Sequence, residues 1–302
     1  MATADLQMDA RDWTRLVVLS VLWGATFFFT GVALKELPPL TLVFLRLSIA
    51  TLILLPVVWI SSVRWPKGVS GWWPYVVMAF INNAVPFSLI VMGQTYIPSG
   101  LASVINATTP VFTVLIAAAF GAERLIWRRV AGVLIGLLGV VILRGFDFDI
   151  HSRQTIGIML GLGATVCFGL SALWATRRLS HAVPLGAATF QLISASLMML
   201  VLSFAVDRPW QLQMPGLVTW AAILGLAALS TALGFIIFFQ IIMRSGASNV
   251  VLVTLLVPVS ALLLGYFILH EQIVAREIAG ALVIASALLV MDGRIFRLFR
   301  GS

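Results

Sequence analysis

The residues best suited to chemistry in this 302-residue sequence are uncharged amides, three prolines and one arginine, all embedded in long apolar stretches. A proline inside a helix cannot hydrogen-bond the carbonyl four residues before it. The three prolines and the residues four positions before them are Pro86 with Asn82, Pro110 with Asn106, and Pro258 with Thr254. Each freed carbonyl therefore belongs to a polar residue. This pattern predicts a polar cavity wall that can bend at the prolines, and kinks satisfied by neighbouring helices are the structural alternative.

Amide side chains form the second group of candidates. Asn83 and Gln94 fall on one face of a helix, together with Phe87. The candidate cavity amides are Asn82, Asn83, Gln94, Asn106, Gln240 and Asn249. Buried amides are costly unless they are paired, and they offer both donors and acceptors to a zwitterion or a polar metabolite. Hydrogen bonds between helices are the alternative role.

Two tryptophans and one arginine lie far from the ends of their apolar stretches. Trp23 and Trp174 are candidates for an aromatic cavity wall, since tryptophan in membrane proteins otherwise concentrates at the interfaces; simple packing is the alternative. Arg46 is the only charged residue well inside such a stretch. Charges at membrane depth are expensive and usually functional, so Arg46 is a candidate for carboxylate binding or gating. A side chain extended to the helix end is the alternative.

The elements that must position these residues are suited to a lipid bilayer. Hydrophobic residues make up 61% of the chain and charged residues 10%, against about 25% charged in soluble proteins. Stretches of about 20 apolar residues predict membrane-spanning helices. The expected helices run over residues 13–34, 39–61, 73–96, 99–121, 126–144, 155–176, 184–206, 216–241, 247–269 and 275–293. The predicted fold class is an all-α integral membrane protein with ten transmembrane helices.

The distribution of basic residues predicts the orientation of these helices. With the N-terminus on the inner side, thirteen of the 19 Lys and Arg residues fall on inner segments and five on outer ones. The positive-inside rule therefore places both termini in the cytoplasm. This placement also accounts for the net charge of +8, so no nucleic-acid partner is expected. The expected partners are the lipid bilayer and a small-molecule substrate.

The two halves of the sequence, residues 1–148 and 149–302, resemble each other. At a spacing of 148 residues Pro110 aligns with Pro258, and Glu123 with Glu271. We expect each of the two glutamates either to pair with a neighbouring residue in a turn or to cap a helix. At shorter spacings Gln94 aligns with Gln240, and Arg46 with Gln191. Because each half would hold five helices, an odd number, the second would enter the membrane from the opposite side. Inverted repeats with a binding site between them are typical of secondary transporters.

The segment 123–132, continuing through 139–143, resembles the repeat signature of the EamA family of the drug/metabolite transporter superfamily. A second copy covers 271–291, and Trp23-Gly24 and Arg46 also fit the family pattern. The resemblance extends over nearly the whole chain. It implies a 5+5 arrangement of helices around a central cavity lined by the first, third, fourth, sixth, eighth and ninth, with the fifth and tenth at the back. It also implies export of amino acids and related metabolites across a bacterial inner membrane.

Several alternatives accompany this expectation. No Asp or Glu lies near the middle of an expected helix, which favours transport without ion coupling. A multidrug, sugar or other metabolite carrier of the same superfamily is the first alternative, followed by a channel. An intramembrane enzyme is not expected: His270-Glu271 begins an H-E-x-x-H zinc sequence, but position 274 is Val. We expect no cofactor and no metal, and a monomer rather than a dimer.

Overall fold

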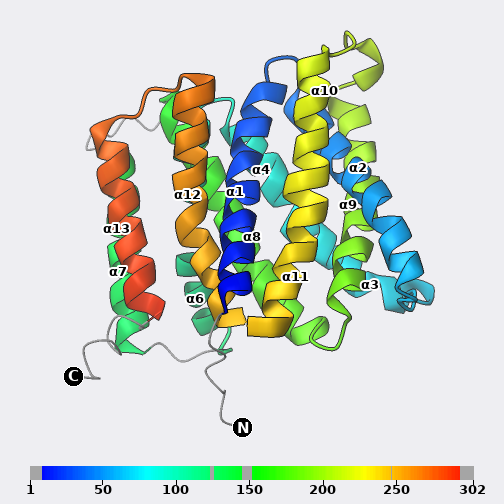
Figure 1. Ribbon diagram of the computed structural model, residues 1–302, viewed down its shortest axis with the longest axis horizontal. Helices are drawn as coiled ribbons and strands as arrows, with labels where there is room; N and C mark the ends of the chain where they lie inside the picture. The colour runs from blue at the N-terminus through cyan, green and yellow to red at the C-terminus, as the bar shows by residue number, and fades with distance from the viewer. Residues whose placement is uncertain (1–8, 123–125, 145–151, 246, 293–302) are drawn as a thin grey trace.

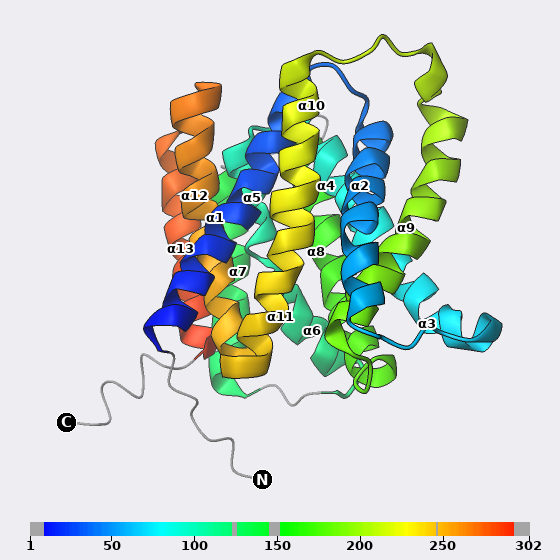
Figure 2. The same cartoon turned by 45° about the vertical axis from the view of Figure 1, so that its right-hand side comes forward.

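The computed structural model describes residues 9–122, 126–144, 152–245 and 247–292. All regular elements in these ranges are helical, and they stand side by side as a bundle (Figure 1). Helix α1 (Ala10–Ala33) begins, and α13 (Ala275–Asp292) ends, at the same end of the bundle. We call this end the lower face and the opposite end the upper face, as they are oriented in Figures 1 and 2.

Several helices are interrupted. In the first half of the chain the remaining elements are α2 (Pro39–Ile60), α3 (Gly68–Ala79), the π-helix η1 (Phe80–Ala84), α4 (Val85–Gly93), α5 (Ser99–Asn106), α6 (Thr109–Ala119) and α7 (Trp127–Arg144). In the second half they are α8 (Arg153–Arg178), α9 (Pro184–Val206), the 3₁₀-helix η2 (Pro209–Gln211), α10 (Leu217–Leu224), the π-helix η3 (Gly225–Leu233), α11 (Gly234–Ser245) and α12 (Ala247–Leu269). Two long helical stretches, α3–η1–α4 and α10–η3–α11, therefore each contain a π-helix.

The helix starts follow from local sequence. Pro39 and Pro184 are the first residues of α2 and α9, a position that tolerates proline because its N–H would have no helical partner. Asp9 caps α1, with its carboxylate accepting the backbone N–H of Asp12 at 2.7 Å. The hydroxyl of Ser152 accepts the N–H of Thr155 at 3.2 Å and caps α8 in the same way.

Most of the bundle has the length and apolarity of membrane helices. Within the described residues, seven helical stretches of 21–26 residues are long and apolar enough to cross a bilayer, and Val253–Leu269 is a shorter apolar helix. The seven are Ala10–Ala33, Pro39–Ile60, Gly68–Gly93, Ser99–Ala119, Arg153–Arg178, Pro184–Val206 and Leu217–Phe238. The prediction of an all-helical, multi-pass membrane protein agrees with these spans.

Helices from the two halves of the chain pack against each other. Helix α1 packs on α12 and on the α10–η3–α11 stretch, while α8 packs on α4, α5 and α6. Helix α2 packs on α9, and α7 packs on α13 at one edge of the bundle (Figure 1). Two buried apolar clusters result, one centred on α2, α4, α9 and η3 and the other on α1, α5 and α12.

Glycines permit the closest of these contacts. A Cβ atom at Gly24 of α1 would overlap the hydroxyl of Ser260 on α12. A Cβ at Gly132 would lie 2.9 Å from the carbonyl oxygen of Ala287, and one at Gly280 would lie 3.0 Å from the carbonyl oxygen of Gly139. Such distances are too short for a larger residue, so α7 and α13 approach each other backbone to backbone at two places.

Candidate functional site

Arg46 lies inside the bundle, although it is charged. Its side chain is 7% exposed, and its Nε–H donates a hydrogen bond to the hydroxyl of Thr231 at 3.0 Å. The guanidinium carbon lies 4.0 Å from the centre of the Phe87 ring, a cation–π contact. In the described part of the chain no carboxylate forms an ion pair with Arg46. The residue thus joins α2 to α4 and η3 through neutral partners.

The π-helix η3 explains how Thr231 presents its hydroxyl to Arg46. The Thr231 hydroxyl donates to the carbonyl of Leu226, five residues earlier, at 2.8 Å, and its oxygen remains free to accept from Arg46. The wider turn of a π-helix changes which side chains face inward, and π-helices are frequent at functional sites. Ser230, next to Thr231, is also buried, and its hydroxyl has no partner in the described residues.

Asn82 is the centre of a second polar contact, between η1, α8 and α9. Its Nδ2–H donates to Oε1 of Gln191 at 3.2 Å, and its Oδ1 accepts the hydroxyl of Ser171 at 2.8 Å. The side chain of Gln191 is 5% exposed and that of Ser171 3%. The amide of Asn82 therefore joins η1 to α8 and α9, whose contacting residues lie 89 and 109 positions later in the chain.

Pro86 and the π-helix before it place Asn82. In η1 the backbone N–H of Val85 reaches the carbonyl of Phe80, five residues back. Pro86 has no N–H to donate to the carbonyl four residues before it. In a π-helix each carbonyl accepts from the N–H five residues later instead, so the missing donor is bypassed. Pro110 lies in the first turn of α6, directly after the break between α5 and α6 at Ala107-Thr108. Pro258, in contrast, lies within an uninterrupted α12.

Three more predicted amides have buried atoms without a partner in the described residues. Asn83 is fully buried, and neither its Oδ1 nor its Nδ2 has a hydrogen bond. Gln94 donates from Nε2 to the carbonyl of Phe27 on α1 at 3.0 Å, but its Oε1 has no partner. Oδ1 of Asn106, at the end of α5, also has none. Buried polar atoms are nearly always satisfied, so these atoms mark places where water or a ligand would be stabilised.

The remaining predicted residues are spread more widely. Trp23 packs against Phe238 with ring centres 5.3 Å apart, joining α1 to α11. Trp174 donates its indole N–H to the carbonyl of Pro74 at 3.0 Å, joining α8 to α3. Gln240 is exposed on α11, and the side chain of Asn249 lies outside the described residues. The structure therefore brings Arg46 and Asn82 into interhelical polar contacts, but it does not gather all the candidates at one point.

Three residues of these contacts were not predicted from the sequence. Thr231 and Ser171 gave no signal, because hydroxyl residues are common in membrane helices. Gln191 was noted only as the residue aligned with Arg46, and that alignment is the one signal that could have singled it out. Both side chains contact a π-helix of the opposite half: Arg46 contacts η3, and Gln191 contacts η1.

Carboxylates cap helix N-termini at the upper face. Glu271 accepts the backbone N–H groups of Ser99 at 2.8 Å and Gly100 at 3.1 Å, at the start of α5. Asp207 accepts the N–H and hydroxyl of Thr41, in the first turn of α2. In each case the carboxylate and the helix belong to different halves of the chain. A negative charge stabilises the N-terminus of a helix, so these caps hold the halves together at this face.

A third cap of the same kind involves Glu36. Its Oε2 accepts the backbone N–H of Gly216 at 2.7 Å, directly before α10. The capping predicted for Glu271 is confirmed, although its partner helix is distant in sequence; Glu123 lies outside the described residues. Arg276, in the first turn of α13, donates to Oε1 of Gln154 at 3.1 Å.

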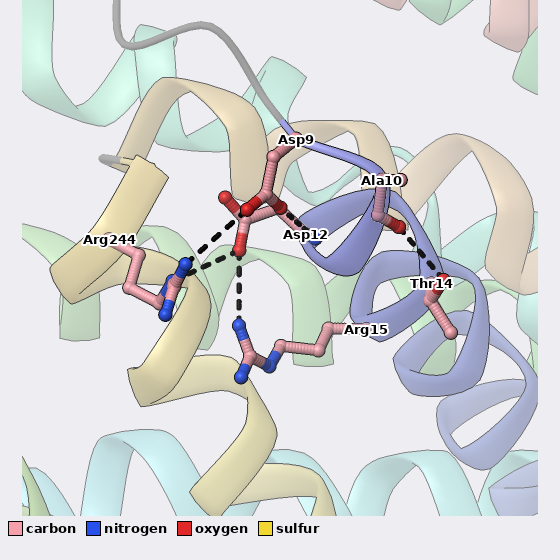
Figure 3. Close-up of polar contacts among 6 residues, drawn as sticks. All are labelled: Asp9, Ala10, Asp12, Thr14, Arg15 and Arg244. Atoms are coloured by element: carbon pink, nitrogen blue, oxygen red, sulfur yellow. Dashed lines mark hydrogen bonds and ion pairs between the residues drawn. The ribbon is translucent and has the colours of Figure 1, made fainter.

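Ion pairs join α1 to α11 at the lower face (Figure 3). The guanidinium of Arg244, in the last turn of α11, lies 3.4 Å from carboxylate oxygens of both Asp9 and Asp12. Arg15 pairs with Asp12 at 3.2 Å. The side chain of Arg244 is 48% exposed, so solvent weakens these pairs. They order the start of α1 rather than provide a buried charged site.

One surface hollow lies apart from the polar contacts. It has a volume of about 500 Å³ and is lined by Gly68, Val69, Trp72, Trp73 and Val76 of α3. These residues are apolar and belong to α3, in the part of the helix that precedes Asn82 and η1. The hollow offers no polar group to a metabolite. Its lining suits a lipid chain better.

Comparison with known proteins identifies the family. The model of the EamA-like transporter family matches residues 14–145 and 155–291. The chain belongs to this family. As an EamA protein it is a multi-pass membrane transporter, and the resemblance noted in the sequence is confirmed.

Several known transporters are similar to the chain over nearly their full length. The chain is 26% identical to the "Uncharacterized transporter YvbV" of Bacillus subtilis, over 92% of this chain and 90% of the relative. It is 24% identical to a "Probable amino-acid metabolite efflux pump" of Escherichia coli (94% and 95%). It is 25% identical to a "Probable terminal-alkyne amino-acid exporter" of Streptantibioticus cattleyicolor (94% of each chain).

The same fold occurs in a solved structure titled "Crystal structure of protein". That chain superposes with a TM-score of 0.68 at 20% sequence identity, covering 96% of this chain and 99% of the other. At this identity the match concerns the fold alone. The EamA bundle described above is therefore an arrangement that is also seen experimentally.

Proposed function

We propose that this EamA protein exports small metabolites, most of all amino acids with aromatic or other apolar side chains, by alternating access between two inverted five-helix halves. The observation that carries the proposal is a pair of polar contacts made by two aligned residues, each with a π-helix of the other half. Arg46 and Gln191 align in the two halves, seven residues after Pro39 and Pro184 respectively. Arg46 hydrogen-bonds η3, and Gln191 hydrogen-bonds η1. A substrate between these contacts would meet similar surroundings from either side.

Glycine contacts support the same relation between the halves. The spacing of 148 residues that relates Gly132 to Gly280 also relates Gly139 to Ala287. The contact of Gly132 with Ala287 accordingly has its equivalent in the contact of Gly280 with Gly139. Two halves that exchange roles by small movements provide two arrangements of similar energy, as alternating access requires.

A second glycine pair extends this support to the central helices. Gly24 of α1 lies against Ser260 of α12. Gly24 aligns with Gly169 of α8 at a spacing of 145 residues, and Ser260 aligns with Phe112 of α6 at a spacing of 148. These aligned positions are also in contact, because a Cβ at Gly169 would lie 3.2 Å from the backbone of Phe112. The family model also matches each half separately.

The proposal includes ten spans with both termini in the cytoplasm. Helices α7 and α13 would complete the five spans of each half. The lower face would then be cytoplasmic, in accord with the excess of Lys and Arg in its loops and ends. The upper face, with its carboxylate caps, would face outward from the inner membrane. We further propose that the protein works as a monomer.

The choice of substrate rests on the polar contacts and on relatives. Amides and hydroxyls from α5, α8, α9, η1 and η3 offer neutral hydrogen-bonding groups, which suit amino acids. Phe87 and Phe168 lie beside them, with ring centres 6.4 Å apart. The relatives from Escherichia coli and Streptantibioticus cattleyicolor carry names that refer to amino-acid export.

Counterflow in proteoliposomes tests the proposal. Purified protein is reconstituted into liposomes loaded with unlabelled amino acid, and uptake of labelled phenylalanine, leucine, lysine and glutamate is compared with that of empty liposomes. We expect exchange of the apolar amino acids, reduced several-fold by Asn82→Ala and unchanged by Gln272→Ala, an exposed position in the 270–274 loop. No exchange of any amino acid by the unaltered protein would refute the proposal.

A further inference from the structure

Arg46 has an unbalanced positive charge in the interior of the protein. Within the described residues, its hydrogen-bond and cation–π partners are a threonine hydroxyl and a phenylalanine ring, both neutral. The carboxylates of the described ion pairs lie at the lower face, with Asp9 and Asp12. A buried charge without an opposite partner is strongly unfavourable. Its presence therefore needs a reason other than packing.

The side chain of Arg46 is held so that one edge of its guanidinium has no hydrogen-bond partner among the described residues. Thr231 occupies the Nε–H, and the ring of Phe87 covers a face at 4.0 Å. Arginine has five N–H donors, so the four on Nη1 and Nη2 donate no hydrogen bond to a described residue. These four form the fork that binds a carboxylate through two parallel hydrogen bonds.

The aligned residue in the other half argues against an architectural role. Gln191 occupies the equivalent position with a neutral amide, and its Oε1 is satisfied by Asn82. The same kind of interhelical contact is thus made without a charge. If Arg46 served only to join α2 to η3, an amide would do so at lower cost. Nor does its side chain extend to solvent, because Arg46 is 7% exposed.

We propose that Arg46 is the binding site for the carboxylate of the transported compound. This inference rests on the proposed export function and narrows its substrate class to compounds that carry a carboxylate. The bound anion would neutralise the guanidinium, and the rings of Phe87 and Phe168 would contact an apolar group attached to it. Amines without a carboxylate would be excluded, since two positive charges would repel each other in a medium of low dielectric constant.

A matched series of compounds tests the site in the unaltered protein. Phenylalanine, phenylalaninamide and phenethylamine share the ring and the amine, but only the first has a carboxylate. Each is used as a competitor of labelled phenylalanine exchange in proteoliposomes. We expect the amide and the amine to compete at least about tenfold less well, the loss of one charge-assisted contact. Equal competition by all three, with phenylalanine exchange intact, would overturn the inference and leave the export function standing.

Variants provide a second readout that does not depend on transport. The melting temperature of the detergent-purified protein is measured with sodium phenylacetate or with phenylacetamide. We expect phenylacetate alone to raise the melting temperature of the unaltered protein and of Arg64→Gln, an exposed control. Arg46→Gln should lose the response, and Arg46→Lys should retain part of it. Stabilisation of Arg46→Gln by phenylacetate equal to that of the unaltered protein would overturn the inference.

The two readouts separate the two hypotheses. Stabilisation by phenylacetate that depends on Arg46, without exchange of any amino acid, would support the carboxylate site and refute the export function. If Arg46→Gln does not fold, the competition series and Arg46→Lys still decide the matter, because neither requires loss of the charge.

Discussion

The carboxylate of Glu271 accepts hydrogen bonds from both the backbone N–H and the hydroxyl of Ser99, at 2.8 and 2.7 Å. The two residues are 172 positions apart in the chain. Glu271 follows α12 in the second half, whereas Ser99 begins α5 in the first. Helix caps are usually local, within three residues of the helix they serve. Here the cap joins the two halves, so its loss should weaken the association between them.

Removing the charge of Glu271 should destabilise the bundle. Glutamine in its place keeps one acceptor oxygen but loses the favourable interaction of a carboxylate with the helix N-terminus. We expect Glu271→Gln to lower the free energy of unfolding by about 1–2 kcal/mol. Thermal unfolding in detergent, followed by tryptophan fluorescence, measures the change, and Gln272→Ala is the control. Equal melting temperatures for Glu271→Gln and the control would contradict the prediction.

Asn82 and Gln191 should be energetically coupled. Because Nδ2 of Asn82 donates to Oε1 of Gln191, removing either side chain abolishes the same hydrogen bond. The effects of Asn82→Ala and Gln191→Ala on the free energy of unfolding should then be non-additive, by about 0.5–1.5 kcal/mol. A double-mutant cycle in detergent measures this, and a parallel cycle of Asn82→Ala with Thr95→Ala, an exposed position, should show additivity. Additive effects in the first cycle would mean that the contact contributes nothing.

The sequence was sufficient for the features that depend on local composition. Long apolar stretches predicted helices that suit a membrane, and Pro39 and Pro184 marked the starts of α2 and α9. The irregular backbone near Pro86 and Pro110 could also be anticipated, because a missing N–H must alter the hydrogen bonding around it. The missing N–H of a proline does not determine the form of the irregularity, which is a π-helix before Pro86 and a break between helices before Pro110.

Side-chain partners were beyond sequence reasoning, because they depend on how distant helices pack. Asn82 is separated from Gln191 by 109 residues, and Arg46 from Thr231 by 185. A hydroxyl at position 231 looks the same in sequence whether it faces lipid or a guanidinium. The π-helix η3 contains Thr231, which contacts Arg46. It contains no proline, and nothing in the composition of residues 225–233 predicts a π-helix there.

Enlarging Gly24 should disturb the contact of α1 with α12. An added Cβ would overlap the hydroxyl of Ser260 and lie 2.9 Å from the carbonyl oxygen of Val257. We expect Gly24→Ala to lower the free energy of unfolding by about 1–3 kcal/mol, and Ser260→Gly in the same chain to restore part of it. The control is Gly163→Ala, where the nearest neighbouring atom would be 3.4 Å away. Equal stability of the two alanine variants in thermal unfolding would contradict this packing.

Transport should not depend on a proton or sodium gradient. Carriers that couple to these ions usually hold a carboxylate near the membrane midplane, and no Asp or Glu of this sequence falls near the middle of an expected helix. We expect the initial rate and the final level of phenylalanine exchange in proteoliposomes to remain the same, within about twofold, when a pH or sodium gradient is imposed. An ionophore that dissipates each gradient is the control. Accumulation of phenylalanine above its equilibrium level, abolished by the ionophore, would show that the carboxylates at the helix ends, Glu36, Asp207 and Glu271 first among them, take part in coupling after all.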